Sequence, residues 1–163
     1  MSPFLCPLRR KKGRKGRGKK EKDADVVLYC SKGAFLFTRA ALPLMLPLAK
    51  DDKTAHPPTI IYTGATASVK SNAMMSSFST GKYALRALSQ SVAKEFGPQG
   101  IHVAHAVIDG VIDVPHTKEW LKDMPKEGKI EPGAIAEAYW FLHTQPKSCF
   151  TNEIDVRPML EKW

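Results

Sequence analysis

A lysine follows a phenylalanine by four positions in the segment SSFSTGKYALRALSQSVAKEFGPQGIHV, residues 76–103. Residues at positions i and i+4 share one face of a helix, so Phe78 and Lys82 would be neighbours in a helical segment. A tyrosine at the first position would place a phenol beside the ammonium group, an arrangement suited to proton transfer. Phenylalanine has no hydroxyl. The pair therefore has the spacing that would suit a phenol beside an ammonium group, but it lacks the hydroxyl.

Alternating helical and strand-like segments must position this pair. A helix is predicted over 77–96, since Leu85, Leu88, Val92 and Phe96 share one face and Gly97-Pro98 follows. Strands are predicted in TIIYTG (59–64), IHVAHAVID (101–109) and FTNEIDVRP (150–158), and a further helix in EPGAIAEAYWFLHTQP (131–146). This order predicts an α/β fold with a parallel sheet and helical crossovers, whose ligands bind at the carboxyl ends of the strands.

The segment YCSKGAFLFTRAALPLMLPLAK, residues 29–50, predicts a largely buried helix before the first strand. Pro43 and Pro47 are expected to kink it or end its last turns. The residues near helical spacing, which we expect to form its buried face, are Phe35, Leu36, Ala40, Pro43, Leu44 and Leu48.

Positive charge is concentrated at the start of the chain. Residues 1–25 hold ten Lys/Arg and three Asp/Glu, and so carry +7 of the net charge of +9. This glycine-rich tail is predicted to be disordered, with a globular domain over 26–163. Its glycines lack the flanking strand and helix of a dinucleotide-binding turn. Weak nonspecific contact with polyanions, or a nuclear localisation signal, is the functional alternative to an inert solvated tail.

The sequence gives little support for disulfide bonds, a zinc site or a membrane span. Three scattered cysteines predict neither a disulfide framework nor a zinc site. No stretch approaches the roughly 20 apolar residues of a membrane span. We expect a cytoplasmic protein without membrane contact, and the basic tail is also compatible with a nuclear location.

Five segments in order resemble the C-terminal half of the short-chain dehydrogenase/reductase family. They are GAFLFTRAALPLML, IIYTGATAS, FSTGKYALRALSQSVAKEFGPQGIHV, VIDGVIDVP and IAEAYWFLHTQP. The resemblance implies a partial Rossmann-like, doubly wound parallel sheet of about three strands and three to four helices. It also implies an NAD- or NADP-dependent oxidoreductase that transfers a hydride to or from a carbonyl or alcohol carbon.

The family's catalytic residues are largely replaced. By the resemblance, Lys82 is the retained lysine of the YxxxK motif and Phe78 replaces its tyrosine, while Ala65 replaces the serine and Cys30 the asparagine. The cofactor side is expected to involve Lys82 and the residues that border the nicotinamide: Gly64, Asp109, Gly110, Ile112 and Val114. Phenylalanine and alanine supply neither the proton nor the oxyanion donor, so the usual relay is predicted to be lost.

The family's glycine-rich turn and the strands around it find no match in these residues, which argues against strong dinucleotide binding. Loss of those strands would expose the edge of TIIYTG and lower stability. Self-association, or pairing with a homologue, is expected through the helices near 31–48 and 77–96. The functional alternatives are a non-catalytic partner of a full-length homologue, and an enzyme with altered chemistry that takes its proton from water through Asp109.

Overall fold

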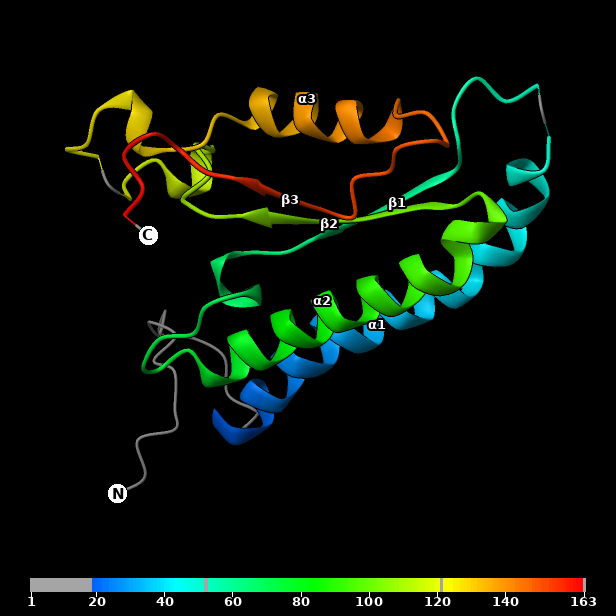
Figure 1. The fold of residues 1–163 in the computed structure, drawn as a ribbon. Helices are drawn as coiled ribbons and strands as arrows, with labels where there is room; N and C mark the ends of the chain where they lie inside the picture. Colours follow the sequence, from blue (N-terminus) through cyan, green and yellow to red (C-terminus); the bar gives the residue numbers. More distant parts are fainter. Residues whose placement is uncertain (1–18, 52, 121, 163) are drawn as a thin grey trace.

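The computed structural model describes residues 19–51, 53–120 and 122–162, with the backbone alone for 19–28. It has an α/β architecture in which one parallel sheet lies between two layers of helices (Figure 1). The expectation of a partial Rossmann-like sheet is confirmed. The main elements are α1 (Lys19–Ala49), β1 (Thr59–Thr63), α2 (Ser76–Phe96), β2 (His102–Ile108), α3 (Pro132–His143) and β3 (Glu153–Val156).

The three strands are parallel and lie in the order β1-β2-β3. Thr59 of β1 pairs with His102 of β2, and His105 of β2 pairs with Glu153 of β3. α1 and α2 cover one face of the sheet and α3 covers the other (Figure 1). β2 is buried along its whole length because it has a strand on each side and helices on both faces.

Successive side chains of the strands enter two separate apolar clusters, as the period of two requires. Ile60 and Val103 join the cluster under α1 and α2, which also contains Leu85 and Val92. On the other face, Ile61 and residues of β2 and β3 pack with α3 and the loop before it; they include Ala106, Ile108, Ile130, Ile135, Tyr139, Ile154 and Val156. Both faces of the sheet are therefore apolar, as expected of a parallel sheet.

The buried face of α1 differs from the predicted one. Leu42 and Ala49 are buried against α2, and Thr38 is buried with its hydroxyl bonded to that of Tyr62 in β1. Leu44 and Leu48, which were expected to be buried, are 74% and 50% exposed. Phe35 and Leu36 from the same predicted face are also exposed. The prediction failed because α1 carries apolar residues on more than one face, so spacing alone does not identify the face that is covered.

α1 is also longer than predicted. Pro43 and Pro47 both lie inside it, and the helix continues to Ala49 because its last turns pack on α2. At its other end the helix begins at Lys19, so residues 19–25 are helical although they were assigned to the disordered tail. The rest of that predicted tail lies outside the described residues.

Two neighbouring leucines of α1 test which face is buried. We expect Leu42→Ala to lower the free energy of unfolding by about 2–5 kcal/mol, because it leaves a cavity in the core between α1 and α2. Leu44→Ala should change it by less than about 0.5 kcal/mol, since that side chain is mostly exposed. Urea unfolding of the two variants measures both values. Equal decreases in the free energy of unfolding of Leu42→Ala and Leu44→Ala would contradict this packing of α1.

Candidate functional site

Lys82 lies at the carboxyl edge of the sheet, in the first half of α2. Its Nζ donates a hydrogen bond to the carbonyl oxygen of Thr63, the last residue of β1, at 2.9 Å. Burial lowers the pKa of the Lys82 ammonium, and the nearby Cys30 opposes this change. An ammonium group has three donors, so Lys82 keeps capacity for further oxygen ligands.

Phe78 lies one helical turn before Lys82, with the lysine Nζ 5.8 Å from the centre of its ring. This distance is within the range of a cation–π contact. Ala65 caps the short helix Thr66–Ser68 that follows β1. Ala65 is thus in the turn that follows β1, and Phe78 is on the helix that carries Lys82. Neither side chain can donate a proton.

A hydroxyl does occur three residues after Ala65. The side chain of Ser68 is fully buried, and its Oγ accepts a hydrogen bond from the backbone N–H of Ala65 at 3.1 Å. Gly64 lies in the same turn, and a Cβ added to it would come within 2.3 Å of the His105 Nε2 and 2.8 Å of the Ser68 Oγ. Gly64 is therefore required by packing under the turn.

A cavity of about 340 Å³ connects two of the predicted site residues, Cys30 and Lys82. Its walls come from α1, β1 and α2, and its other lining residues are Gly33, Ala34, Phe37, Ile60, Ile61, Tyr62, Thr63 and Leu85. The lining is mostly apolar, with the lysine at the end nearest the carboxyl edge of the sheet. The arrangement offers one cation beside an apolar groove.

Asp109 lies beyond β2 and is 2% exposed. Its Oδ1 accepts a hydrogen bond from the Thr66 hydroxyl, which ties the loop after β1 to the end of β2. Its Oδ2 has no hydrogen-bond partner among the described residues, and the Arg157 guanidinium is 3.7 Å away. Asp109 therefore combines a buried carboxylate oxygen with a cation just beyond hydrogen-bond distance.

The other predicted residues of this loop have structural contacts. Gly110 has a φ of +150°, and an added Cβ would come within 2.7 Å of Pro158. Ile112 forms a bridge with Ile130. The backbone N–H of Val114 donates to the hydroxyl of Thr117 at 3.1 Å. Thr117 was not predicted, and it supplies a buried hydroxyl three residues after Val114.

A charged network under α2 was also missed by sequence reasoning. Glu153 of β3 accepts two hydrogen bonds from Arg86 of α2, at 2.6 and 2.8 Å. Its Oε2 is also 3.0 Å from the Nδ1 of His105, which is fully buried. Burial lowers the pKa of His105, and the Arg86 hydrogen bonds lower the pKa of Glu153. This network joins α2 to the middle of the sheet.

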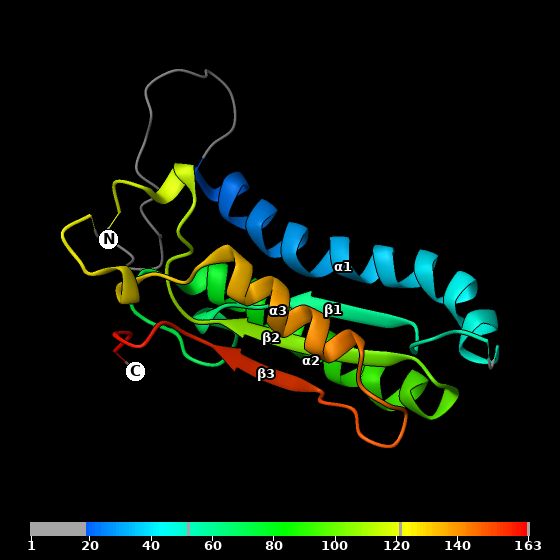
Figure 2. The same ribbon diagram turned by 90° about the horizontal axis from the view of Figure 1, so that it is seen from above.

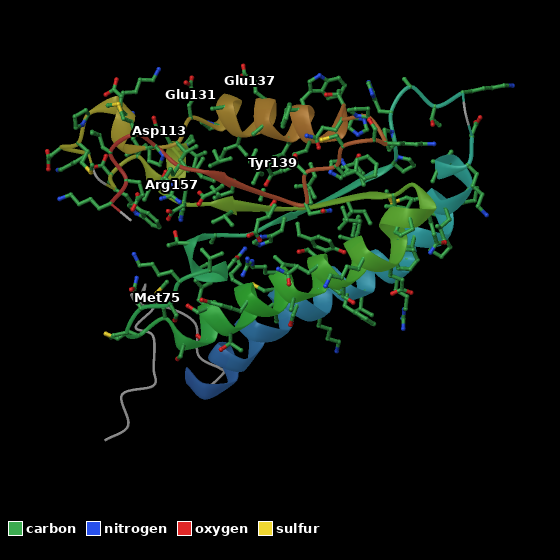
Figure 3. The ribbon with its side chains drawn as sticks, in the orientation of Figure 1. Met75, Asp113, Glu131, Glu137, Tyr139 and Arg157 are labelled. Atoms are coloured by element: carbon green, nitrogen blue, oxygen red, sulfur yellow. The ribbon has the colours of Figure 1, made fainter. Side chains whose placement is uncertain are left out.

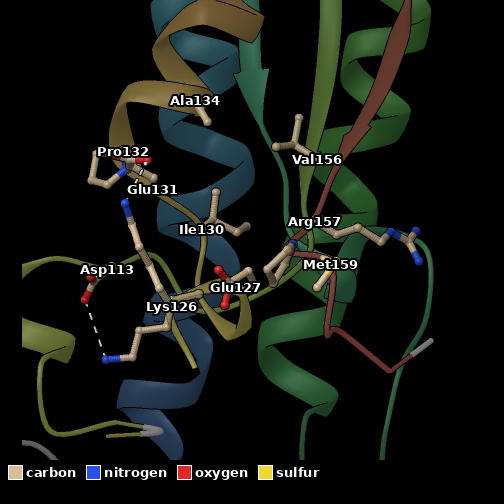
Figure 4. A pocket seen from close by; sticks show the side chains of 12 residues that line it. Asp113, Lys126, Glu127, Ile130, Glu131, Pro132, Ala134, Val156, Arg157 and Met159 are labelled. Carbon is tan, nitrogen blue, oxygen red and sulfur yellow. Dashed lines mark ion pairs between the residues drawn. The ribbon is translucent and has the colours of Figure 1, made fainter. Parts of the chain in front are cut away.

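A second cavity, of about 490 Å³, lies on the α3 side of the sheet (Figure 4). Its rim carries the ion pairs Lys129–Asp113 at 3.5 Å and Lys126–Glu131 at 3.8 Å. Arg157, which faces Asp109, lines this cavity as well. In Figure 3, Arg157 and Asp113 lie at the same end of the molecule, and Tyr139 lies between α3 and the sheet.

Membrane-spanning helices and metal sites were sought among the described residues, and neither was found. Across the described ranges, no helix is long and apolar enough to cross a bilayer. The same residues contain no cluster of three or more His, Cys, Asp or Glu side chains that could hold a metal ion.

Comparisons of sequence show one family. Residues 17–125 match the family model described as short chain dehydrogenase. An oxidoreductase of Staphylococcus aureus, described as uncharacterized, is 32% identical over 128 residues, which are 78% of this chain and 51% of the relative. The chain thus spans about half the length of the curated relatives that it matches.

Comparisons with solved structures agree with the sequence comparisons. A short-chain dehydrogenase from Rhodopseudomonas palustris is 34% identical, with a TM-score of 0.63 over 83% of this chain and 51% of that structure. An alcohol dehydrogenase from Thermococcus sibiricus, solved with 5-hydroxy-NADP, has a TM-score of 0.69 over 97% of this chain and 61% of that structure. The second is only 18% identical and supports the fold alone.

The buried imidazole of His105 makes the free energy of unfolding depend on pH. The pKa of His105 is lowered in the folded state, so below about pH 6.5 the unfolded chain binds more protons and stability falls. Glu153, whose pKa is also lowered, adds a loss only below about pH 4.3. Urea unfolding should show a decrease in stability from pH 7.5 to 5.5, and His105→Gln should reduce this decrease. The exposed His116→Gln is the control and should keep it; an undiminished decrease in His105→Gln would contradict the assignment.

Proposed function

Because the chain belongs to the short-chain dehydrogenase family, we propose that it forms the lysine-bearing half of an NAD(P)-dependent oxidoreductase and has lost the usual proton relay. The observation that carries this proposal is the position of Lys82. Its ammonium lies at the carboxyl edge of a parallel sheet, where ligands bind in open α/β folds. It also borders the 340 Å³ cavity and has donors to spare.

The residues present fit one part of a nicotinamide dinucleotide. Lys82 is suited to bind the hydroxyl oxygens of the nicotinamide ribose, and the loop that carries Gly64 and Ala65 lies beside it. The residues present do not offer a binding site for the pyrophosphate, because the sequence lacks the glycine-rich turn that would hold it at a helix N-terminus. The chain therefore supplies the ribose side of a cofactor site, and the cofactor, when bound, supplies or accepts the hydride.

Proton transfer is the step that this chain handles differently. In the usual arrangement a phenol gives its proton to the carbonyl oxygen, with the lysine lowering the phenol pKa. Here Phe78 retains the aromatic ring over Lys82 but has no proton to give. Ala65 has no hydroxyl to polarise the carbonyl. Standard hydride transfer is accordingly expected to be impaired.

Restoring the two hydroxyls tests this proposal. We expect Ala65→Ser with Phe78→Tyr, behind the grafted N-terminal half of the Rhodopseudomonas palustris relative, to raise NADPH- or NADH-dependent reduction of 4-nitrobenzaldehyde. General acid catalysis is worth roughly 10²–10⁴-fold. Adding Lys82→Ala to the double variant should remove the gain. No gain over the same graft without the two substitutions would contradict the assigned positions.

A second candidate is an enzyme in which Asp109 exchanges protons with water. Its support is the buried Asp109 Oδ2, which has no hydrogen-bond partner among the described residues and faces Arg157. Arg157 also lines the 490 Å³ cavity, so a substrate there would lie close to this pair (Figure 4). This chemistry would use a different part of the sheet edge from Lys82.

The two candidates respond oppositely to single substitutions. If Asp109 carries the chemistry, Asp109→Asn should lower turnover by roughly 10²-fold or more, and Lys82→Ala should leave it unchanged. The lysine-based proposal expects Lys82→Ala to weaken cofactor binding instead. Measuring kcat and KM for NADPH in both variants of the grafted enzyme separates them.

A further inference from the structure

Lys82 has surroundings that favour a neutral amine. None of the ion pairs between described residues includes Lys82, and Glu153, the carboxylate that contacts α2, is bonded to Arg86 instead. Burial is the main cause that lowers the pKa of the Lys82 ammonium. The folded chain therefore holds a larger share of this lysine as the amine than it would if the side chain were fully in water.

The amine borders an open groove. Seen from above, α1 runs along the free edge of β1, the side away from β2 on which no described strand pairs (Figure 2). The 340 Å³ cavity lies between these two elements and α2, and Lys82 lines it. Phe37, another lining residue, is 61% exposed, so the cavity is open to solvent on that side.

The groove suits an apolar chain more than a polar one. Apart from Lys82, its walls are mostly apolar, with Ala34, Ile61 and Leu85 among them. Its volume falls within the range of protein pockets that hold small molecules, roughly 300–1,000 Å³. A molecule that fits these walls therefore needs an apolar body and one group that reacts with, or bonds to, an amine.

We propose that Lys82 binds aldehydes that carry an apolar chain, by forming an imine at its Nζ while the chain lies in the groove. The nitrogen attacks the carbonyl carbon, and a C–N bond replaces the C–O bond. The aldehyde oxygen leaves as water together with the two amine protons. The imine then takes up one proton from solvent. No oxidant or reductant takes part.

The contacts of the nitrogen persist through this reaction. A neutral amine has two N–H groups and one lone pair, so one N–H can donate to the Thr63 carbonyl while the lone pair attacks. The protonated imine keeps one N–H, which can make the same bond that the ammonium makes at 2.9 Å. The ring of Phe78, 5.8 Å away, stabilises the ammonium and the protonated imine alike, because both are cations.

This inference goes beyond the proposed function. It uses the same lysine, so an aldehyde and a nicotinamide ribose would compete for the Lys82 Nζ. It does not require a cofactor to bind, and it does not need the hydroxyls that Ala65 and Phe78 lack. Imine formation is thus a reaction for which the side chains of this groove are sufficient.

The test incubates the purified 163-residue chain with limiting hexanal and sodium cyanoborohydride, which reduces an imine to a stable secondary amine. Peptide mass spectrometry gives the label on each lysine. Lys94 is the reference, since it is exposed in the last turn of the same helix and lines neither of the two cavities. We expect Lys82 to carry roughly tenfold more label, the effect of burying about two methylene groups of the aldehyde.

Three variants separate the amine from the groove. Lys82→Arg keeps a cation and N–H donors, so it should remove the enriched label without lowering the melting temperature. Gly33→Leu adds a side chain to the groove where an added Cβ would meet no atom within 4 Å, and should reduce hexanal labelling of Lys82 to the level of Lys94. Gly133→Leu is the matched control, because Gly133 is a helical glycine with the same open space on α3, and it should keep the enrichment.

Equal labelling of Lys82 and Lys94 in the folded chain would overturn the proposal. An enrichment that is as large with glycolaldehyde, which has no apolar chain, would overturn it as well, because the groove would then contribute nothing. Cys30 lines the same cavity, but this reduction does not fix thiol adducts, so the label reports amines alone. The mixtures hold no nicotinamide cofactor, and the result is therefore independent of whether the chain binds one.

Discussion

The free edge of β1 is the constraint on which the rest of the structure depends. A parallel strand buried under helices on both faces normally has neighbours on both sides, because backbone N–H and C=O groups away from water require partners. β1 has β2 on one side, and on the other the Thr63 carbonyl is bonded by Lys82. Lys82, which the sequence resemblance assigns to the lysine of the YxxxK motif, thus also bonds the end of the strand edge that has no partner among the described residues.

The site and the open groove are therefore parts of one feature. Lys82 borders the cavity that runs along β1 under α1, and Cys30 and Phe37 line the same cavity. What fills the groove also sets how much water reaches the ammonium, and burial is the largest cause of its lowered pKa.

Local sequence pattern was sufficient to predict the three strands and α2, and insufficient to predict which residues these elements contact. The strand segments and the helix ending before Gly97 follow from apolar runs and turn residues, and α2 does end at Phe96. Spacing could not decide which face of α1 is covered, because Leu42 and Leu44 are the same residue type on different faces. The bond between Arg86 and Glu153 joins residues 67 positions apart, and that between His105 and Glu153 residues 48 apart. No local pattern reports such pairs.

The most direct test of the account is a titration of the isolated 163-residue chain with NADPH and NADH, followed by its melting temperature. A ligand that binds only the folded state must raise stability by RT ln(1 + [L]/Kd). With the groove open and no glycine-rich turn in the chain, the account predicts no change up to millimolar cofactor. A rise that increases with cofactor concentration would show that these residues form a dinucleotide site alone, and would contradict the proposal that they supply only the ribose side of a cofactor site.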